Sequence, residues 1–281
     1  MTLSKQKTCS NTIAFAFLCL LAVIFLIPIL LVLLNSFKSR FYISSSPFAL
    51  PNSETFVGFE NYLNGLSSSG FFISFIRSVW VSIASVLVII VCTSMASWFI
   101  VRVKNKFTKA IYFLFAFSMI VPFQMVMYTM TFIVNRISFD NVFGIVFVYL
   151  GFGAGLSVFM FTGFVKAVPL EIEEAAEIDG CNPLQTFFLV VFPILKPTII
   201  TVSILNSMWV WNDYLLPYLI LGTDHKTVPV AIQIAMQGAY GATDYGGFMA
   251  MLVLAIIPIV IFYIASQKYI IKGVISGAVK G

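Results

Sequence analysis

The sequence predicts an all-α integral membrane protein, a bundle of six transmembrane helices with a helical loop between the fourth and the fifth. Hydrophobic residues make up 60% of the 281 residues and charged residues only 10%, whereas a soluble domain is roughly 45–50% apolar and about 25% charged. A soluble protein of this composition would expose apolar patches large enough to aggregate. Long apolar runs without alternation favour membrane helices over the strands of a barrel.

Six stretches have about the 20 apolar residues that a helix needs to cross roughly 30 Å of hydrocarbon. In chain order they are 12–34, 77–101, 110–133, 143–165, 198–221 and 248–267. The first is longer than the roughly 7–15 apolar residues of a signal peptide, and no small-residue cleavage site follows it. Pro28, Pro122, Pro217 and Pro258 fall inside four of the stretches, and each predicts a kink.

The distribution of Lys and Arg predicts that both termini lie in the cytoplasm. With the N-terminus inside, 11 of the 16 basic residues fall on the cytoplasmic side and five on the outer side. Residues 35–76 then form an outer loop, and 268–281 form a cytoplasmic tail. The net charge of +5 needs no nucleic-acid partner, because the positive-inside bias and attraction to anionic membrane lipid account for it.

The loop over 166–197 holds five of the eleven acidic residues, Glu171, Glu173, Glu174, Glu177 and Asp179. Pro169 opens a helix whose first turns carry the glutamates, and Gly180 supplies a left-handed turn after it. Asn182 and Pro183 begin a second short helix. The pattern therefore predicts a helix–turn–helix at the inner membrane face. The alternative interpretation, an amphipathic loop at the membrane surface without a partner, stays open. Helices at a membrane surface are usually basic, however, and this loop is acidic.

Here the sequence resembles a known family. Glu174-Ala175-Ala176, then Gly180, then Val190-Val191-Phe192-Pro193 match in spacing the signature of permease subunits of binding-protein-dependent ABC importers, with Val190 and Phe192 replacing Ile and Leu. The run from Val168 to Gly180 looks like the sugar-importing branch, and the C-terminus is similar to the second, maltose-type permease. Further matches are Ser36-Phe37-Lys38, Asn61-Tyr62, Trp211-Asn212-Asp213-Tyr214, Asp244-Tyr245-Gly246 and Met249-Ala250.

The resemblance implies that the loop is a coupling helix seated on a cytoplasmic ATPase. The residues expected to dock there are Glu174, Ala175, Ala176, Gly180 and Pro193. The implied partners are a second permease forming a heterodimer, an ATPase dimer that binds ATP and Mg²⁺, and an extracytoplasmic sugar-binding protein. The chain itself has no G-x-x-x-x-G-K-[ST] loop, and we expect no cofactor, metal or catalytic residue in it. The solute would be a disaccharide, an oligosaccharide or a similar polyol.

The fifth stretch holds the candidate pathway residues Trp209, Trp211, Asn212 and Asp213, which combine flat faces with hydrogen-bonding groups. The two tryptophans are equally compatible with anchoring at the headgroups, whereas burying Asn212 and Asp213 in hydrocarbon would be costly. Two alternatives remain, an ion-coupled secondary carrier and a membrane receptor without transport. Asp213 is the one clear ionisable residue inside a predicted span, which gives little support to ion coupling.

Overall fold

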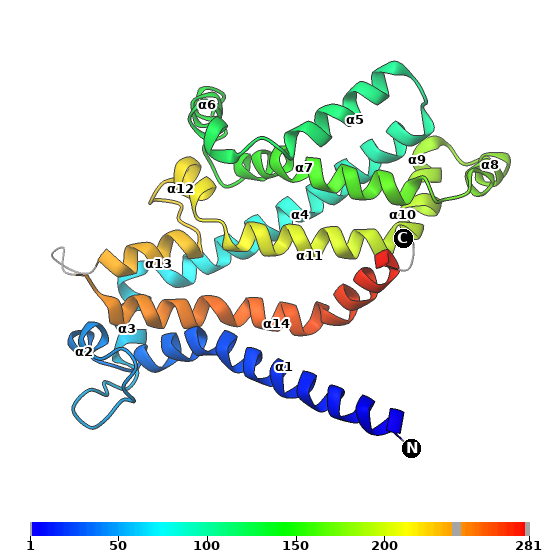
Figure 1. The fold of residues 1–281 in the computed structure, drawn as a ribbon. Helices are drawn as coiled ribbons and strands as arrows, with labels where there is room; N and C mark the ends of the chain where they lie inside the picture. Colours follow the sequence, from blue (N-terminus) through cyan, green and yellow to red (C-terminus); the bar gives the residue numbers. More distant parts are fainter. Residues whose placement is uncertain (1, 238–242, 279–281) are drawn as a thin grey trace. The chain divides into compact units, whose positions relative to one another are not determined.

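The computed structural model describes residues 2–237 and 243–278, and in this part of the chain all regular structure is helical (Figure 1). The all-α class is therefore confirmed. The chain divides into two compact units. The first comprises residues 1–71 and 232–257, and the second comprises 72–231 and 258–281.

Four helical segments are long and apolar enough to cross a membrane. They are Thr12–Asn35 of α1 (Thr2–Asn35), α4 (Phe71–Arg102), α7 (Gly144–Val165) and Tyr245–Tyr269 of α14 (Tyr245–Ala278). Two bent helix pairs bring the number to six if each pair is one span. One pair is α5 (Lys106–Ser118) with α6 (Phe123–Arg136), bent by 109°, and the other is Pro183–Ile194 with α11 (Lys196–Asn212), bent by 77°.

The stretch predicted as a single helix over 110–133 is broken in the structure. Helix α5 ends at Ser118 and α6 begins at Phe123, with Pro122 as the residue before α6. Proline restricts the residue before it to extended conformations and has no N–H to donate to the preceding turn. The kink predicted at Pro122 is therefore a complete break with a sharp change of direction.

The stretch predicted as one helix over 198–221 is also interrupted. Helix α11 ends at Asn212, Asp213 is extended (ψ 122°), and α12 (Leu215–Leu221) follows. The prediction placed the bend at Pro217, but Pro217 lies buried within α12. Pro28 and Pro258 stay inside the continuous helices α1 and α14. Pro217 lies in the first turn of α12, where a backbone N–H has no intrahelical acceptor, so the proline fits there without a bend.

In the first unit, the end of α1 is fastened to α3 (Glu60–Ser69), with the short helix α2 (Arg40–Ser45) between them in the chain. We call these contacts the α1–α3 junction. The Asn61 amide donates to the carbonyl oxygens of Ser36 and Lys38, both at 2.8 Å, and the hydroxyls of Ser36 and Tyr62 share a hydrogen bond of 2.7 Å. The N-terminal turn of α14 approaches closely, because a Cβ at Gly246 would overlap the Asn61 side chain.

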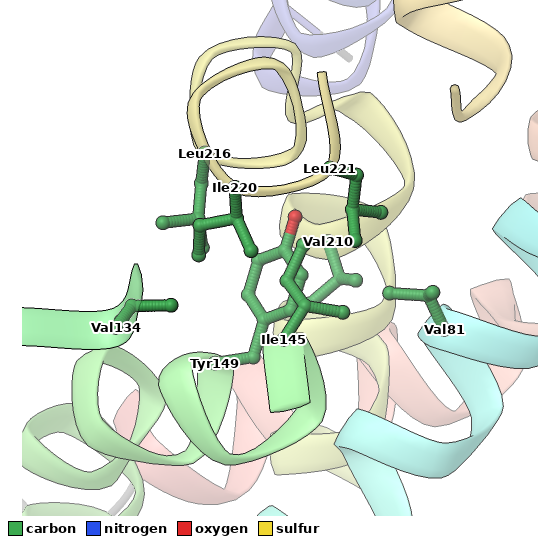
Figure 2. Close-up of a cluster of buried hydrophobic side chains, with 8 residues drawn as sticks. All are labelled: Val81, Val134, Ile145, Tyr149, Val210, Leu216, Ile220 and Leu221. Atoms are coloured by element: carbon green, nitrogen blue, oxygen red, sulfur yellow. The ribbon is translucent and has the colours of Figure 1, made fainter. Parts of the chain in front are cut away.

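The second unit contains two clusters of buried apolar side chains. Figure 2 shows the first, Val81, Val134, Ile145, Tyr149, Val210, Leu216, Ile220 and Leu221, in which Tyr149 of α7 faces residues of α11 and α12. The second cluster joins α4, α7 and the segment before α11, with Phe161, Phe187 and Leu195 fully buried. These clusters hold the loop at 166–197 and the break at Asp213 against long helices.

The loop at 166–197 contains α8 (Leu170–Ile178), α9 (Pro183–Gln185), a π-helical segment η1 (Thr186–Val191) and α10 (Phe192–Ile194). After α12, α13 (Val228–Gln237) leads toward α14. Helix α14 continues through the predicted tail as far as Ala278, and the tail residues 279–281 lie outside the described residues.

Candidate functional site

Helix α8 and the turn after it form a compact elbow, which we define as residues 169–183. Pro169 precedes α8 with φ −58° and ψ 137°, and Glu171 and Glu173 lie in the first turn, where carboxylates complement the helix dipole. Gly180 has φ +86°, a conformation that costs other residues steric energy, and no atom stands within 4 Å of a Cβ built there. Glycine is thus needed at this position for the backbone turn alone.

The segment after the turn begins at Asn182, the predicted N-cap, and the structure adds a capping box with Gln185. The Asn182 side chain accepts a hydrogen bond from the Gln185 N–H at 3.0 Å, and the Gln185 side chain accepts one from the Asn182 N–H at 2.9 Å, with Pro183 as first helical residue. The large apolar side chains of this segment are only partly buried. Phe187 and Val191 are fully buried, whereas Leu184 and Phe188 are exposed.

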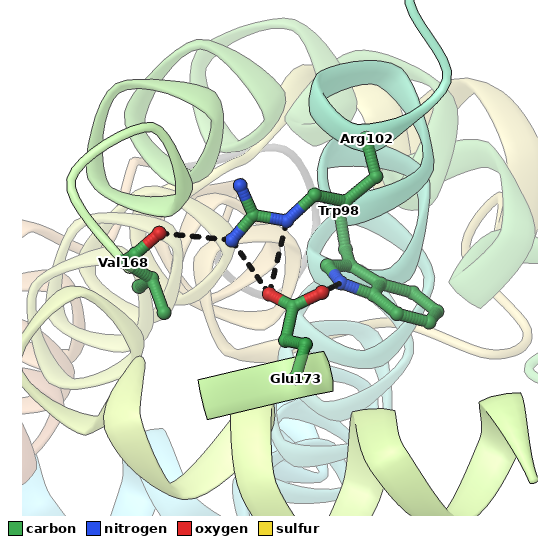
Figure 3. A network of polar contacts seen from close by, with 4 residues as sticks. All are labelled: Trp98, Arg102, Val168 and Glu173. Carbon is green, nitrogen blue, oxygen red and sulfur yellow. Dashed lines mark hydrogen bonds and ion pairs between the residues drawn. The ribbon is translucent and has the colours of Figure 1, made fainter. Parts of the chain in front are cut away.

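The elbow is fastened to the end of α4 by a buried ion pair, shown in Figure 3, which we call the α4–α8 junction. One carboxylate oxygen of Glu173 accepts from Arg102 Nε at 3.0 Å and from Arg102 Nη2 at 2.6 Å. The other carboxylate oxygen accepts from Trp98 Nε1 at 2.9 Å. Arg102 Nη2 also donates to the Val168 carbonyl at 3.0 Å. The guanidinium therefore holds both the helix and the chain that leads into it.

The α4–α8 junction is shielded from solvent, since the side chain of Glu173 is 5% exposed and that of Arg102 is 19% exposed. Charge-assisted hydrogen bonds to a carboxylate are about twice as strong as neutral ones. Removing one partner of such a pair leaves an uncompensated buried charge, which costs about 3–5 kcal/mol. Movement of α8 relative to α4 would have to break these bonds, so the two helices form one mechanical unit.

The five residues predicted to dock an ATPase differ in exposure. Glu174, Ala175, Gly180 and Pro193 are exposed, while Ala176 is 8% exposed and packs against the chain itself. Helix α8 thus has one face turned inward, with Glu173 and Ala176, and one face turned outward. Sequence reasoning missed the role of Glu173, because its partner is distant in the chain. The only signal was an arginine at the end of a predicted span.

Asp213 lies at the break between α11 and α12 and is hydrogen-bonded within the chain. Its carboxylate accepts from the Tyr149 hydroxyl at 3.1 Å and from the backbone N–H groups of Leu215 and Leu216 at 3.1 Å and 3.4 Å. It therefore caps the first turn of α12. Tyr149 was not among the predicted residues. Its ring is fully buried and meets the Trp209 ring edge to face at 5.3 Å.

The other predicted pathway residues are not gathered at one point. Asn212 is exposed and donates to the Met208 carbonyl at 2.7 Å. Trp211 contacts the Phe75 ring edge to face at 5.7 Å and lines a cavity of about 350 Å³. This cavity is mainly apolar and also receives the serines Ser82, Ser203 and Ser207. It combines an indole face with hydroxyl groups on an otherwise apolar wall.

Comparison with known proteins identifies the family. Residues 89–276 match the model of the binding-protein-dependent transport system inner membrane component. The chain is 34% identical over 261 residues, 92% of its own length and 93% of the relative's, to the probable starch degradation products transport system permease protein AmyC of Thermoanaerobacterium thermosulfurigenes. It is 35% identical over 263 residues, 92% of its length and 93% of the relative's, to the multiple sugar-binding transport system permease protein MsmG of Streptococcus mutans.

The fold also has a counterpart among solved structures. A chain of a bacterial ABC transporter involved in the import of the acidic polysaccharide alginate aligns with a TM-score of 0.76 and 20% identity, covering 96% of this chain and 98% of the other. The matched family residues include the α4–α8 junction, the elbow and the break at Asp213. The chain is a multi-pass membrane protein that belongs to the family of inner-membrane components of binding-protein-dependent transport systems.

Proposed function

We propose that this chain is one of two permease subunits of an ATP-driven importer of sugars, with the solute a disaccharide, an oligosaccharide or a similar polyol. The supporting relatives are named for starch degradation products, for multiple sugars and for melibiose, raffinose and stachyose. In this proposal, ATP and Mg²⁺ bind a separate cytoplasmic ATPase dimer, and an extracytoplasmic binding protein delivers the solute. Both termini of the chain lie in the cytoplasm.

The α8 elbow is the observation that carries the proposal. Its inward face is fixed to α4 through Glu173 and Arg102, and its outward face presents Glu174 and Ala175. Small side chains permit close approach of a partner, and an exposed carboxylate can meet a basic group. A partner that moved the outward face would move α4 as well, because the α4–α8 junction resists separation. Closure of the ATPase dimer would in this way shift the bundle from inward-open to outward-open.

Energy is transmitted only if the ATPase binds the two membrane conformations with different affinity. Glu174, Ala175, Ala176, Gly180 and Pro193 are the proposed docking residues. Because Ala176 is buried, we propose that it packs beneath the docking face and that the exposed residues contact the ATPase. On the solute side, Trp209, Trp211, Asn212 and Asp213 are the proposed pathway residues.

Reconstitution tests the proposal against ion-coupled transport and against a receptor without transport. The chain is placed in liposomes with its sister permease, its ATPase and its binding protein, and labelled sugar uptake is measured. We expect uptake to require ATP on the side of the liposome membrane that carries the ATPase. Proton and sodium gradients should have no effect on uptake. Uptake driven by an ion gradient without ATP would replace the proposal with secondary transport, and solute binding without uptake would favour the receptor.

A further inference from the structure

A second cavity, of about 790 Å³, lies in the second unit beside the α4–α8 junction. Its walls come from the last turn of α4, the short connection to α5, the first turns of α5 and the end of α7. Helices α4 and α7 are both candidate membrane spans. The cavity therefore lies where two spans end, at the level of the lipid headgroups.

The cavity is lined by four basic side chains and by no acidic one. They are Arg102, Lys104, Lys109 and Lys166. The Arg102 guanidinium is already occupied by Glu173 and the Val168 carbonyl. The three lysines have no carboxylate within 4 Å among the described residues, where the single ion pair is that of Arg102 and Glu173. The cavity thus concentrates positive charge that the chain does not neutralise.

Two further polar side chains of the cavity, those of Asn105 and Thr108, are already hydrogen-bonded, whereas the buried Thr162 hydroxyl has no partner among the described residues. Asn105 and Thr108 form the capping box of α5, and the Thr108 hydroxyl also reaches the Val103 carbonyl. The ammonium group of Lys166 lies over the Tyr112 ring, 5.7 Å from its centroid. A ligand would therefore meet ammonium groups as its main donors, with an aromatic ring and the Thr162 hydroxyl also in the lining. That set of groups binds an anion.

We propose that this cavity binds the phosphate of an anionic phospholipid headgroup. A phosphodiester and a free phosphate share the chemistry that ammonium groups recognise. The lipid is favoured because the cavity lies at the end of two spans and because Ile100, Val101 and Leu170 give it an apolar wall that suits the glycerol and the start of the acyl chains. Basic pockets between helices at the cytoplasmic side of a membrane are typical sites for anionic headgroups.

The site goes beyond the proposed function, since binding lipid needs neither solute nor ATPase. Arg102 borders the cavity and also forms the α4–α8 junction. A bound phosphate would add a second anion near this guanidinium and would lie along the wall that includes Leu170, the first residue of α8. A bound lipid would therefore lie next to the α4–α8 junction.

The experiment measures lipid retention by the purified full complex in detergent, using native mass spectrometry with added phosphatidylglycerol or phosphatidylcholine. The variant carries Lys104→Gln, Lys109→Gln and Lys166→Gln, and the matched control carries Arg40→Gln, Arg136→Gln and Lys196→Gln, which remove the same charge at exposed positions. We expect the cavity variant to lose phosphatidylglycerol affinity by about tenfold or more. The control and a triple Lys→Arg variant should retain it.

Three outcomes would overturn the proposal. These are equal retention of phosphatidylglycerol by the cavity variant and the control, equal retention of phosphatidylcholine by the wild type, and displacement of phosphatidylglycerol by millimolar inorganic phosphate. The last would assign the site to a soluble anion. If the triple variant fails to assemble, Lys109→Gln alone carries the same comparison, because the Lys109 side chain is exposed and forms no ion pair among the described residues.

Discussion

The α4–α8 junction and the α1–α3 junction each fasten a short helix to the end of a candidate membrane helix, but with different chemistry. In the first, the Glu173 carboxylate receives hydrogen bonds from Arg102 and Trp98. In the second, the neutral Asn61 amide donates to two backbone carbonyls. Removing one partner of a buried ion pair lowers the free energy of unfolding strongly. A junction of neutral groups depends instead on close packing.

The two junctions therefore suit different tasks. The charged junction ties α8, which has an exposed acidic face, to a long helix, so a force on that face is passed on. The neutral junction is packed so closely at Gly65 and Gly246 that an added Cβ would meet Met251 or Asn61. It is expected to stabilise its unit without moving. In the proposed function, the buried ion pair lies where a partner would act, whereas the α1–α3 junction consists of amide and hydroxyl hydrogen bonds with close packing.

The largest expected effect comes from removing the basic partner of the charged junction. Arg102→Ala leaves Glu173 buried without a counter-charge and should destabilise the protein by about 3–5 kcal/mol. Thermal unfolding in detergent measures this, and ATP-driven uptake should fall more than tenfold. The double swap Arg102→Glu with Glu173→Arg should recover part of the loss. If the Arg102→Ala protein is as stable and active as the wild type, the α4–α8 junction neither stabilises the protein nor links α8 to α4 during transport.

Substitutions at the neighbouring residues Glu173 and Glu174 should distinguish an effect on stability from an effect on ATP-driven uptake. Glu173→Gln should lower stability by about 1–3 kcal/mol, less than full removal of a partner, because the amide oxygen still accepts a hydrogen bond and Arg102 is partly exposed. Glu174→Lys, on the exposed face, should change stability by less than about 0.5 kcal/mol and yet abolish ATP-driven uptake. Unfolding and uptake are measured on both variants. Normal sugar-stimulated ATP hydrolysis in the Glu174→Lys complex would take the docking role away from this face.

The neutral junction should respond in stability alone. Asn61→Ala leaves the Ser36 and Lys38 carbonyls without their donor, and Gly246→Ala forces a methyl group against the Asn61 side chain. Each should cost about 1–3 kcal/mol, with Ser67→Ala at an exposed position of α3 as the control. Uptake per correctly folded complex should stay at the wild-type level. Uncoupled ATP hydrolysis in either variant would give this junction a mechanical role as well.

A smaller effect is expected at the break between α11 and α12. Asp213→Ala removes the cap of α12 and should destabilise by about 1 kcal/mol. If Asp213 also contributes to the pathway, uptake falls while ATPase binding is retained, and Tyr149→Phe, which removes only one of its hydrogen bonds, gives a weaker defect. Wild-type uptake by Asp213→Ala would restrict this residue to helix capping.

The smallest effect concerns pH and the Lys38 side chain, which lies next to the α1–α3 junction. Lys38 is buried, its ammonium donates to the Ser46 carbonyl at 2.9 Å, and burial lowers the pKa of this ammonium. The folded protein therefore releases this proton at a lower pH than the unfolded chain, and the unfolding free energy rises with pH between the two values. Relative to Lys38→Met, the wild type should gain thermal stability as pH increases above neutrality. Parallel pH profiles would contradict this.

Much of the local structure could be predicted from the sequence. The start of α8 after Pro169, the left-handed turn at Gly180 and the N-cap at Asn182 follow from residues within a few positions of one another. Such features depend on backbone preferences and nearby side chains. The matched motifs at Ser36 and Asn61 were noticed separately, and the structure joins them in one junction.

What the sequence did not predict depends on distant partners. Glu173 and Glu174 look alike in the sequence, and only contact with Arg102, 71 positions earlier, distinguishes the buried one from the exposed one. The stretch over 198–221 is long and apolar enough for one span, and its proline predicted a bend at Pro217 and not at Asp213. Its break at Asp213 is stabilised by Tyr149 from another helix. Periodicity and hydropathy carry no information about either partner.

The most direct test of the account is a cross-link from the outward face of α8. A photo-reactive amino acid replaces Glu174 in the assembled complex, and the same probe replaces Ser67 on the exposed surface of α3 as the control. We predict that the probe at 174 captures the separate ATPase subunit, that the yield changes when ATP binds, and that the probe at 67 does not capture it. Failure to capture the ATPase from 174, or equal capture from 67, would contradict the account.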